Sequence, residues 1–287
     1  MSSPLNSTWE GGCYEVDEYT PQQIGEMRAR EAEEEEQKKQ MKEAWERDLA
    51  ARLQEDPNYV PLVAPVFSEP DKLAVYNNRR WLLEKIIPVK FLNGSEIMHQ
   101  KVMQHASLWN EYSGVKFIFV SKEEEAYVKI GFGGDRTSWS LIGTNCKATG
   151  QNEESMHFGL LTEESSDMDY SRTVLHEFGH ALGFVHEHQQ PNAVGIKWNE
   201  KQVYLDCAAE MNWSEERVKE QILTPMSKNF VTGTNFDNLS IMLYPIRKSW
   251  ILEATEDIPC QTTLSPLDIL AVQKWYPPQP YAKRIFH

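Results

Sequence analysis

Five segments in the middle of the chain have the hydrophobic pattern of β-strands. The first, IIPVKFL, is rich in apolar and β-branched side chains, and the next two alternate apolar with polar residues, as strands that bury one face do. WSLIGT and MHFGLL read as two further strands. The predicted strands span residues 86–92, 115–120, 126–132, 139–144 and 156–161.

Helical spacing and capping residues predict helices around these strands. Between Ser95 and Tyr112, apolar side chains recur at helical spacing, which indicates an amphipathic helix packed on a sheet. Its predicted core positions are Ile97, Val102, Ala106 and Trp109. The N-cap candidates of three later helices are Ser171 or Asp169, Ser214, and Ser265 followed by Pro266 and Asp268.

The first of these later helices carries the string HEFGHALGFVH. His176 and His180 are four residues apart, so they share one helix face and their ring nitrogens can converge on one ion about 2.0–2.1 Å away. Gly183 can adopt a positive φ, which can end the helix and bring His186 back as a third ligand. Glu177, beside the first ligand, can take a proton from a zinc-bound water. Three protein ligands are typical of a catalytic zinc.

The whole string resembles the metzincin signature HExxHxxGxxH. That resemblance implies a Met-turn further along the chain, and SIMLY, residues 240–244, looks like one. Met242 would form a hydrophobic floor under the three imidazoles without binding zinc. Tyr244 lies where astacin-like and serralysin-like enzymes carry a tyrosine that can ligate zinc and stabilise the tetrahedral intermediate. A packed core aromatic is the alternative for Tyr244.

Glu187, directly after the third histidine, points to one metzincin branch. Together with Tyr244 it resembles the astacin-like zinc metalloproteases, closest to those of microbial type, over residues 81–276. The resemblance implies an α+β fold, the metzincin (zincin) catalytic domain, with a mixed twisted sheet, a zinc-binding active-site helix, a Met-turn and a C-terminal helix. It also implies a zinc-dependent endopeptidase with one catalytic Zn²⁺ ion and a polypeptide substrate.

The resemblance further implies how the site works. Zinc lowers the pKa of its water toward neutrality, Glu177 removes the proton, and zinc and Tyr244 stabilise the oxyanion. Residues 139–144 are the candidate edge strand that binds extended peptide by main-chain hydrogen bonds, and an inner strand is the alternative. Arg247 or Lys248 is a hypothetical specificity residue that favours an acidic side chain just after the cut; two solvated cations are the alternative.

Two further features allow more than one interpretation. By resemblance to astacins, Glu187 would meet the amino terminus of the matured enzyme, but it can equally be a carboxylate that supports the ligands or a solvated one beside His188. Cys146 and Cys260 are similar in order to a disulfide of astacin domains. Buried free thiols in a reducing compartment are the alternative.

Length and charge divide the chain. Its 287 residues exceed the roughly 200 of a compact catalytic unit, and 40% hydrophobic residues suffice for a core. The first 60 residues hold 15 acidic and 7 basic side chains, and residues 25–54 are helix-prone but charged all round. We therefore expect an acidic extension at 1–75, helix-prone or disordered, and a catalytic domain at 76–287. The extension is either a pro-segment, in which Cys13 could bind zinc, or a docking segment.

Composition also bears on partners and compartment. The amino terminus MSSPLNSTWEGG has no basic n-region and no apolar run, and no apolar stretch approaches the roughly 18 residues of a membrane span. These features predict a cytoplasmic or non-classically secreted protein, although the resembling family is mostly secreted. The net charge of −14 argues against nucleic acid or anionic membrane as partner. The oligomeric state stays unknown from the sequence.

A catalytically silent zinc-fold binding protein, whose acidic N-terminal arm recruits a partner, is the competing hypothesis. It would keep the zinc ligands without needing a general base. The presence of Glu177 beside all three histidines favours the endopeptidase.

Overall fold

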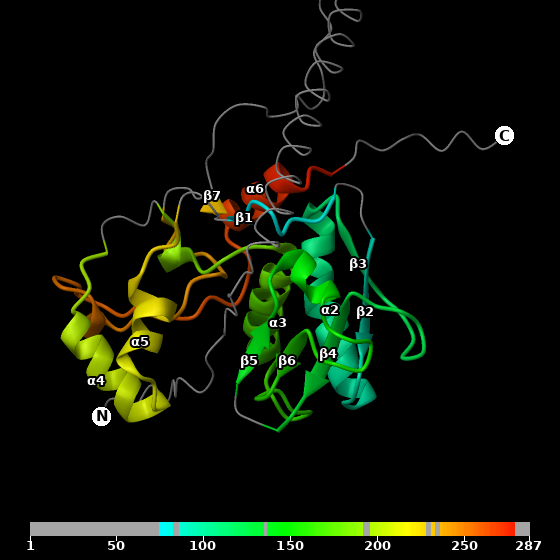
Figure 1. The fold of residues 1–287 in the computed structure, drawn as a ribbon, viewed down its shortest axis with the longest axis horizontal. Coiled ribbons are helices and arrows are strands. Elements are labelled where there is room, and N and C mark those ends of the chain that lie inside the picture. Colours follow the sequence, from blue (N-terminus) through cyan, green and yellow to red (C-terminus); the bar gives the residue numbers. More distant parts are fainter. Residues whose placement is uncertain are drawn as a thin grey trace, which may run out of the picture. The chain divides into compact units, whose positions relative to one another are not determined.

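The computed structural model describes residues 75–82, 86–134, 137–191, 196–227, 231–232 and 236–278 (Figure 1). Apart from Val75, the predicted extension at 1–75 lies outside these described residues, and Cys13 and the helix-prone segment 25–54 lie outside them as well. The division into extension and catalytic domain therefore stays a prediction. Among the described helices, none is both long and apolar enough to cross a membrane.

A five-stranded mixed sheet has the strand order β3-β2-β4-β6-β5. β2 (Ile86–Phe91) runs parallel to β3 (Lys116–Phe119) and to β4 (Val128–Phe132), and β4 runs parallel to β6 (Met156–Phe158). β5 (Ser138–Ser140) pairs antiparallel with β6 and forms one edge. The α+β class and the five predicted strands are confirmed, with β5 and β6 shorter than expected.

The strand predicted to run to Thr144 ends early because the chain turns toward residues 75–82. Gly143 has φ +52°, and a Cβ there would lie 1.8 Å from the carbonyl oxygen of Arg79, so only glycine permits this approach. The amide of Thr144 donates to that same carbonyl at 2.9 Å. Residues Gly143–Lys147 form the short 3₁₀ helix η1 instead of a strand.

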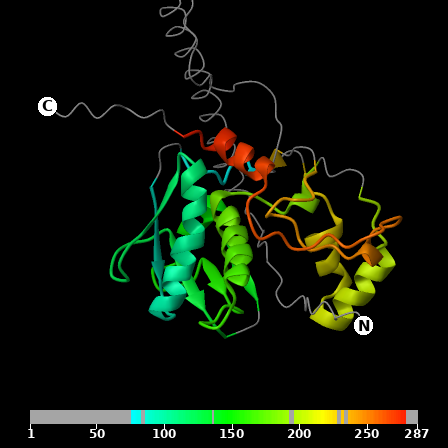
Figure 2. The ribbon, with the colours of Figure 1, turned by 180° about the vertical axis from the view of Figure 1, so that it is seen from behind.

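Two long helices lie side by side on one face of the sheet (Figure 2). α2 (Glu96–Tyr112) starts after Ser95, whose side chain accepts from the amide of Met98. The buried positions of α2 are Met98, Val102, Ala106 and Trp109. The prediction of Ile97 as a core residue is wrong: it is 50% exposed, because it lies about 100° around the helix from Met98.

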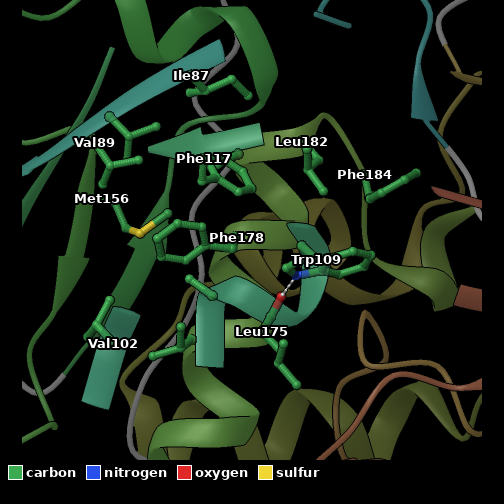
Figure 3. Packing of buried hydrophobic residues seen from close by; sticks show 14 of the residues in the cluster. Ile87, Val89, Val102, Trp109, Phe117, Met156, Leu175, Phe178, Leu182 and Phe184 are labelled. Atoms are coloured by element: carbon green, nitrogen blue, oxygen red, sulfur yellow. Dashed lines mark hydrogen bonds between the residues drawn. The ribbon is translucent and has the colours of Figure 1, made fainter. Parts of the chain in front are cut away.

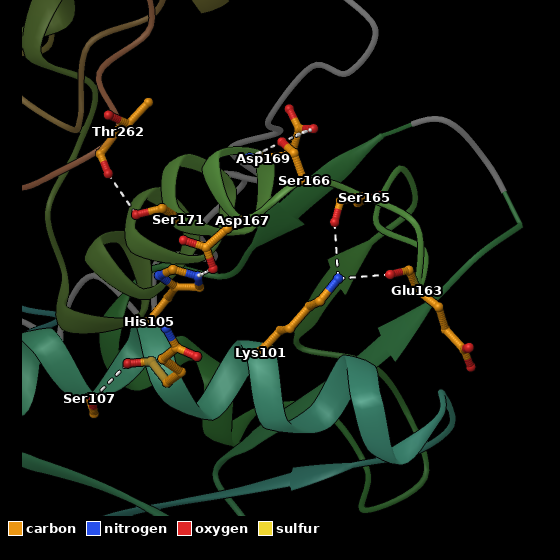
Figure 4. Close-up of polar contacts among 11 residues, drawn as sticks. Lys101, His105, Ser107, Glu163, Ser165, Ser166, Asp167, Asp169, Ser171 and Thr262 are labelled. Carbon is orange, nitrogen blue, oxygen red and sulfur yellow. Dashed lines mark hydrogen bonds and ion pairs between the residues drawn. The ribbon is translucent and has the colours of Figure 1, made fainter.

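The helix that carries the HEFGH string, α3 (Asp167–Leu182), begins earlier than predicted. Its N-cap is Ser166, whose hydroxyl accepts from the amide of Asp169 at 3.1 Å, so the prediction of Ser171 or Asp169 as cap is wrong. The side chain of Ser171 instead donates to the carbonyl of Thr262 at 2.6 Å (Figure 4). Several neighbouring side chains could serve as caps, and the one that precedes the first acidic turn is used.

The start of α3 is fastened to α2 by polar contacts (Figure 4). Lys101 Nζ donates to the carbonyls of Glu163 at 2.7 Å and Ser165 at 3.0 Å. One helical turn on, His105 Nε2 lies 3.0 Å from a carboxylate oxygen of Asp167. These contacts hold the two helices in register at the end of α3 that is opposite to the histidines.

The main core fills the space between the two helices and the sheet (Figure 3). Phe178 of α3 packs edge-on against Phe117 of β3, with ring centroids 4.8 Å apart. Trp109 of α2 donates its indole N–H to the carbonyl of Leu175 at 2.9 Å, which satisfies the one polar atom of a fully buried ring. The HEFGH string therefore lies on a helix that is packed tightly against the sheet and α2.

A second, smaller core follows the HEFGH helix in sequence. It is built from α4 (Glu200–Met211), α5 (Glu215–Val218) and the 3₁₀ turn η4 (Lys248–Trp250). Ser214 caps α5 as predicted, with its hydroxyl accepting from the amide of Arg217. The helix then continues as a single π-helical turn, η3 (Lys219–Leu223), which the sequence pattern did not predict.

The last described helix, α6 (Pro266–Trp275), starts with the predicted capping box of Ser265 and Asp268. Two aromatic residues then hold the end of α3. The indole of Trp81 donates to the carbonyl of Ala181 at 2.7 Å, and the hydroxyl of Tyr276 donates to the carbonyl of Leu182. A two-stranded ribbon of β1 (Val75–Tyr76) and β7 (Val231–Thr232) lies next to this end, since Tyr76 donates its amide to the carbonyl of Gly183.

Candidate metal centre

Three histidines meet where α3 ends. His176 and His180 stand one turn apart on the helix, which terminates at Gly183 with φ +103°. His186 then precedes the 3₁₀ turn η2 (Glu187–Gln189). One nitrogen of each imidazole lies within 4.8 Å of the corresponding nitrogens of the other two. The helix, the left-handed glycine and the short turn together bring the three side chains to one point.

In each of the three rings, the same nitrogen, Nδ1, lies against an oxygen. Nδ1 of His176 lies 2.8 Å from the carbonyl of Ile241, and Nδ1 of His180 lies 2.8 Å from the carbonyl of Phe184. Nδ1 of His186 lies 3.2 Å from Oε1 of Gln189. A carbonyl oxygen only accepts, so each Nδ1 carries the hydrogen and each Nε2 presents a lone pair.

The free nitrogens fit a bound cation. Nε2 of His180 and Nε2 of His186 are 3.1 Å apart, close to the roughly 3.3 Å between two tetrahedral zinc ligands. Nε2 of His176 is buried and has no hydrogen-bond partner among the described residues. Buried lone pairs that face one another repel unless a positive ion lies between them. Neutral imidazoles in threes are the ligand set of a catalytic zinc.

Burial keeps these imidazoles neutral. The three histidines are at most 9% exposed. Desolvation lowers the pKa of His176 to about 4 and that of His180 to about 3, and it lowers the pKa of His186 well below its ordinary value. The neighbouring imidazoles lower the pKa of His180 and His186 further. At neutral pH all three rings are therefore in the form that binds a metal.

Glu177 lies at the start of this helical turn, between the first two histidines in sequence, and is 2% exposed. It is the carboxylate that directly follows the first histidine of the cluster along α3. Its placement on a helix, rather than on a loop, fixes its distance from His176 and His180.

The segment predicted to be a Met-turn contacts α3 through Ile241 at His176 and through Met242 at Gly179. Met242 is fully buried, and its sulfur lies directly on the backbone of α3: a Cβ built at Gly179 would be 2.3 Å from it. Gly179 is thus required by the contact, and sequence reasoning missed it. The sequence did contain an indication of this contact: Gly179 lies in a helix interior, where glycine lowers helix stability by about 1 kcal/mol relative to alanine.

The Met-turn is fastened to α6 by a carboxylate. Oδ1 of Asp268 accepts from the hydroxyl of Ser240 at 2.7 Å, and Oδ2 accepts from the amide of Ile241 at 2.8 Å. The carbonyl of Ile241 in turn accepts from His176. The capping box predicted at the start of α6 therefore also holds the peptide group that orients the first histidine, a role that local sequence patterns do not reveal.

The ring of Tyr244 lies against the histidines. Its centroid is 4.1 Å from that of His186 and 6.0 Å from that of His176. The ring of His188 completes the stack, 5.2 Å from Tyr244 and 5.5 Å from His186. Sequence reasoning placed Tyr244 at the site but did not assign His188 to it. Both residues bring aromatic faces to the third imidazole.

Comparison with known proteins decides the family. The family model described as Astacin, a peptidase family, matches residues 74–258, which is more than half of the chain. The chain belongs to the astacin family. It is a zinc-dependent metalloendopeptidase that acts on peptide substrates, and the hypothesis of a silent binding protein is not supported.

Two solved structures of myroilysin resemble this astacin. One is 32% identical, with a TM-score of 0.68, covering 72% of this chain and 100% of that chain. The other is 30% identical, with a TM-score of 0.53, covering 75% of this chain and 89% of that chain. A comparison with curated proteins gives no match. The first match confirms the metzincin fold along the described core.

Glu187 of this astacin is fully buried, which excludes one of the alternatives for it, a solvated carboxylate. Its Oε1 accepts from the amide of Asp237 at 2.8 Å and from the side chain of Gln190. Its own amide donates to the carbonyl of Met242 at 3.0 Å. Burial raises the pKa of the Glu187 carboxyl well above its usual range, and Asp268 and Asp237 raise it further. The residue ties the third histidine to the Met-turn.

The two cysteines form no disulfide in this structure. Cys146 and Cys260 are both free thiols, with Cys146 fully buried and Cys260 partly buried. The structure therefore agrees with free thiols rather than with the bridge that the resemblance implied.

The guanidinium of Arg247 is already paired. It forms a two-pronged contact with the carboxylate of Glu210, at 2.6 Å on each side, and lies 3.6 Å from Asp206. Both carboxylates belong to α4. This pairing counts against Arg247 as a receptor for an acidic substrate side chain.

Proposed function

We propose that His176, His180 and His186 hold one catalytic zinc ion and that Glu177 and Tyr244 act on the scissile peptide beside it. The observation that carries this assignment is the common orientation of the three imidazoles. Each Nδ1 is bound by an oxygen, and each Nε2 points to the same place. Met242, Gly183 and Glu187 support this arrangement through the packing, the helix end and the backbone contact described above.

Glu177 would carry the proton in both halves of the reaction. A bound zinc ion supplies Lewis acidity, which polarises the substrate carbonyl and makes a water molecule reactive near neutral pH. Glu177 accepts the proton of that water through a carboxylate oxygen as the new C–O bond forms. It then returns the proton to the amine nitrogen as the C–N bond breaks. Its low exposure of 2% strengthens both proton transfers by excluding bulk water.

Tyr244 would stabilise the negative oxygen of the tetrahedral intermediate by donating its hydroxyl hydrogen. The ring packs against the rings of both His186 and His188, so the hydroxyl can be aimed with little loss of conformational freedom. A preorganised donor of this kind typically contributes about 10²–10³-fold in rate.

A polypeptide substrate would lie along β5, the edge strand on the α3 side of the sheet. Among the strands that the structure describes, β5 pairs only with β6, and it contacts α3. An extended peptide can continue the sheet by main-chain hydrogen bonds with Ser138–Ser140, and such bonds provide affinity without contacts to substrate side chains. This placement supports an endopeptidase, because neither end of the substrate chain needs to be bound.

Substitution of Glu177 tests the proposal. Glu177→Ala should bind zinc as the wild type does, because the ligands are untouched, while casein cleavage should fall by at least about 10²-fold. Glu200→Ala, which removes an exposed carboxylate from the start of α4, is the control and should leave both properties unchanged. Undiminished cleavage by Glu177→Ala with full zinc content would remove Glu177 from the mechanism.

A further inference from the structure

The third imidazole of the proposed metal site differs from the first two in the kind of group that accepts its hydrogen bond. His176 and His180 donate from Nδ1 to main-chain carbonyls, of Ile241 and Phe184. His186 donates from Nδ1 to a side chain, Oε1 of Gln189, at 3.2 Å. Gln189 follows three residues later at the end of the η2 turn and is 2% exposed. A side-chain partner can be changed by substitution without altering the backbone.

The orientation of the Gln189 side-chain amide is determined by the hydrogen bond of its nitrogen. Nε2 of Gln189 donates to the carbonyl of Glu220 at 2.5 Å. A carbonyl cannot donate, so the amide nitrogen must face Glu220 and the amide oxygen must face His186. An oxygen facing Nδ1 requires hydrogen on that nitrogen, and this leaves the lone pair on Nε2 for the metal. Gln189 thereby selects the tautomer of His186.

The carbonyl of Glu220 is available because of a local irregularity in the helix. In the π-helical turn η3 a carbonyl accepts from the amide five residues later, as Lys219 does from Thr224 at 2.8 Å. The corresponding residue for Glu220 is Pro225, which has no N–H. The next amide, of Met226, donates to the carbonyl of Gln189 at 2.8 Å.

The neighbouring carbonyl of the π turn is used in the same way. Gln221 has its carbonyl 3.1 Å from Nε2 of His188, and the ring of His188 stacks on that of His186 with centroids 5.5 Å apart. The π turn and Pro225 thus expose two successive carbonyls, and both bind side chains of the η2 turn. These contacts connect the π turn η3, which belongs to the second core, to the imidazole of His186.

We propose that Gln189 is a positioning residue that fixes the tautomer and orientation of His186 by bridging it to the π turn at Glu220. The inference rests on the proposed zinc site. Partners of this kind behind metal-binding histidines typically contribute about 10–100-fold to metal affinity. The proposal assigns to η3 and Pro225, which lie far from the HEFGH string in sequence, a direct role in setting the affinity of the site.

Three variants separate the effect of the hydrogen bond to His186 from that of the hydrogen bond to Glu220. Gln189→Met keeps the length of the side chain and removes both hydrogen bonds. Gln189→Glu keeps an oxygen that accepts from His186 and loses the hydrogen that donates to Glu220. Gln221→Met is the matched control: it removes from the π turn η3 a buried amide whose side-chain oxygen has no hydrogen-bond partner among the described residues, and it leaves in place the main-chain carbonyl that His188 contacts.

Zinc dissociation constants are measured by competition with a chelator on the full chain, beside thermal melting of the metal-free proteins. Gln189→Met should raise the dissociation constant by about 10–100-fold, and Gln221→Met should change it by less than about twofold. Gln189→Glu should bind within a few-fold of the wild type while melting at a lower temperature. Equal weakening by the Met and Glu variants at Gln189, or equal weakening by Gln189→Met and Gln221→Met, would overturn the proposal, because the amide would then only brace the fold.

Nitrogen-15 NMR of labelled histidines in the zinc-loaded proteins gives a second measurement, which unfolding cannot mimic. The wild type should show protonated Nδ1 for all three ligands, and Gln189→Met should change the signal of His186 alone. Three unchanged signals in that variant would contradict the tautomer assignment. If the wild type itself binds no zinc, the proposed function fails; if it binds zinc and Gln189→Met binds equally well, only this inference fails.

Discussion

Adding one methyl group at Gly179 should disturb the packing under the metal centre. A Cβ built there lies 2.3 Å from the sulfur of Met242, 3.3 Å from its terminal methyl carbon and 3.4 Å from Cζ2 of Trp109. Met242 and Trp109 are both fully buried, so neither can move into solvent. Gly179→Ala therefore tests whether the Met-turn and the zinc helix are in direct contact through this glycine.

The magnitude follows from two opposing effects. In an open helix, Gly→Ala stabilises by about 1 kcal/mol. Here the sulfur of Met242 would have to retreat by about 1 Å to reach the usual contact of roughly 3.5 Å, and overpacking of this kind costs about 1–3 kcal/mol. The net change is a destabilisation of up to about 2 kcal/mol. The coupling energy between positions 179 and 242 is a more specific test, because it isolates the contact between the two residues.

A double-mutant cycle with Met242→Ala measures that coupling. Met242→Ala alone should cost about 2–5 kcal/mol, but it removes the sulfur, so Gly179→Ala should then be stabilising. We expect a coupling energy of about 1–3 kcal/mol from urea unfolding of the four metal-free proteins. If Gly179→Ala stabilises equally in both backgrounds, with additivity within about 0.5 kcal/mol, the contact does not constrain position 179.

Two more predictions follow from the surroundings of the site. Gly183→Ala should lower the free energy of unfolding by about 1–2 kcal/mol, because φ is +103° there while its Cβ would meet nothing closer than 3.5 Å; an unchanged urea midpoint would show that the turn relaxes. Burial raises the pKa of the Cys146 thiol from 9.0 to about 12. The unfolded chain therefore loses this proton first, so stability should fall as pH rises above about 9, whereas at lower pH the ionisation of this thiol should not affect stability. The difference in unfolding free energy between wild type and Cys146→Ala should shrink by about 1.4 kcal/mol per pH unit between about pH 9 and 11, and a difference that does not vary with pH would contradict the burial of the thiol.

The HEFGH string could be recognised from sequence as a candidate metal site because its geometry is local. His176 and His180 need only a helix, and Gly183 needs only a positive φ, so spacing and residue type are sufficient. The capping box at Ser265 and Asp268 is local in the same sense, and it was predicted correctly. These features depend on at most a few neighbouring residues.

Contacts between distant segments could not be read from the sequence. Gly179 is explained by Met242, and the orientation of His186 is explained by Glu220; both partners lie far along the chain. The π turn could not be predicted because its residues fit the pattern of an ordinary α-helix. One indication of it was present in the sequence, Pro225, which lacks the amide hydrogen that a carbonyl of the turn would otherwise accept. Errors at Ile97 and at the start of α3 arose where several neighbouring residues suit the same position.

Cleavage of casein by the zinc-loaded full-length protein tests the central claim most directly, measured with a chelator, without it, and after zinc is restored. The account predicts fragments that disappear with the chelator and return with zinc, and no fragments from zinc-loaded Glu177→Ala. Intact casein in the presence of protein that holds one zinc ion per chain, or cleavage that the chelator leaves unchanged, would contradict it.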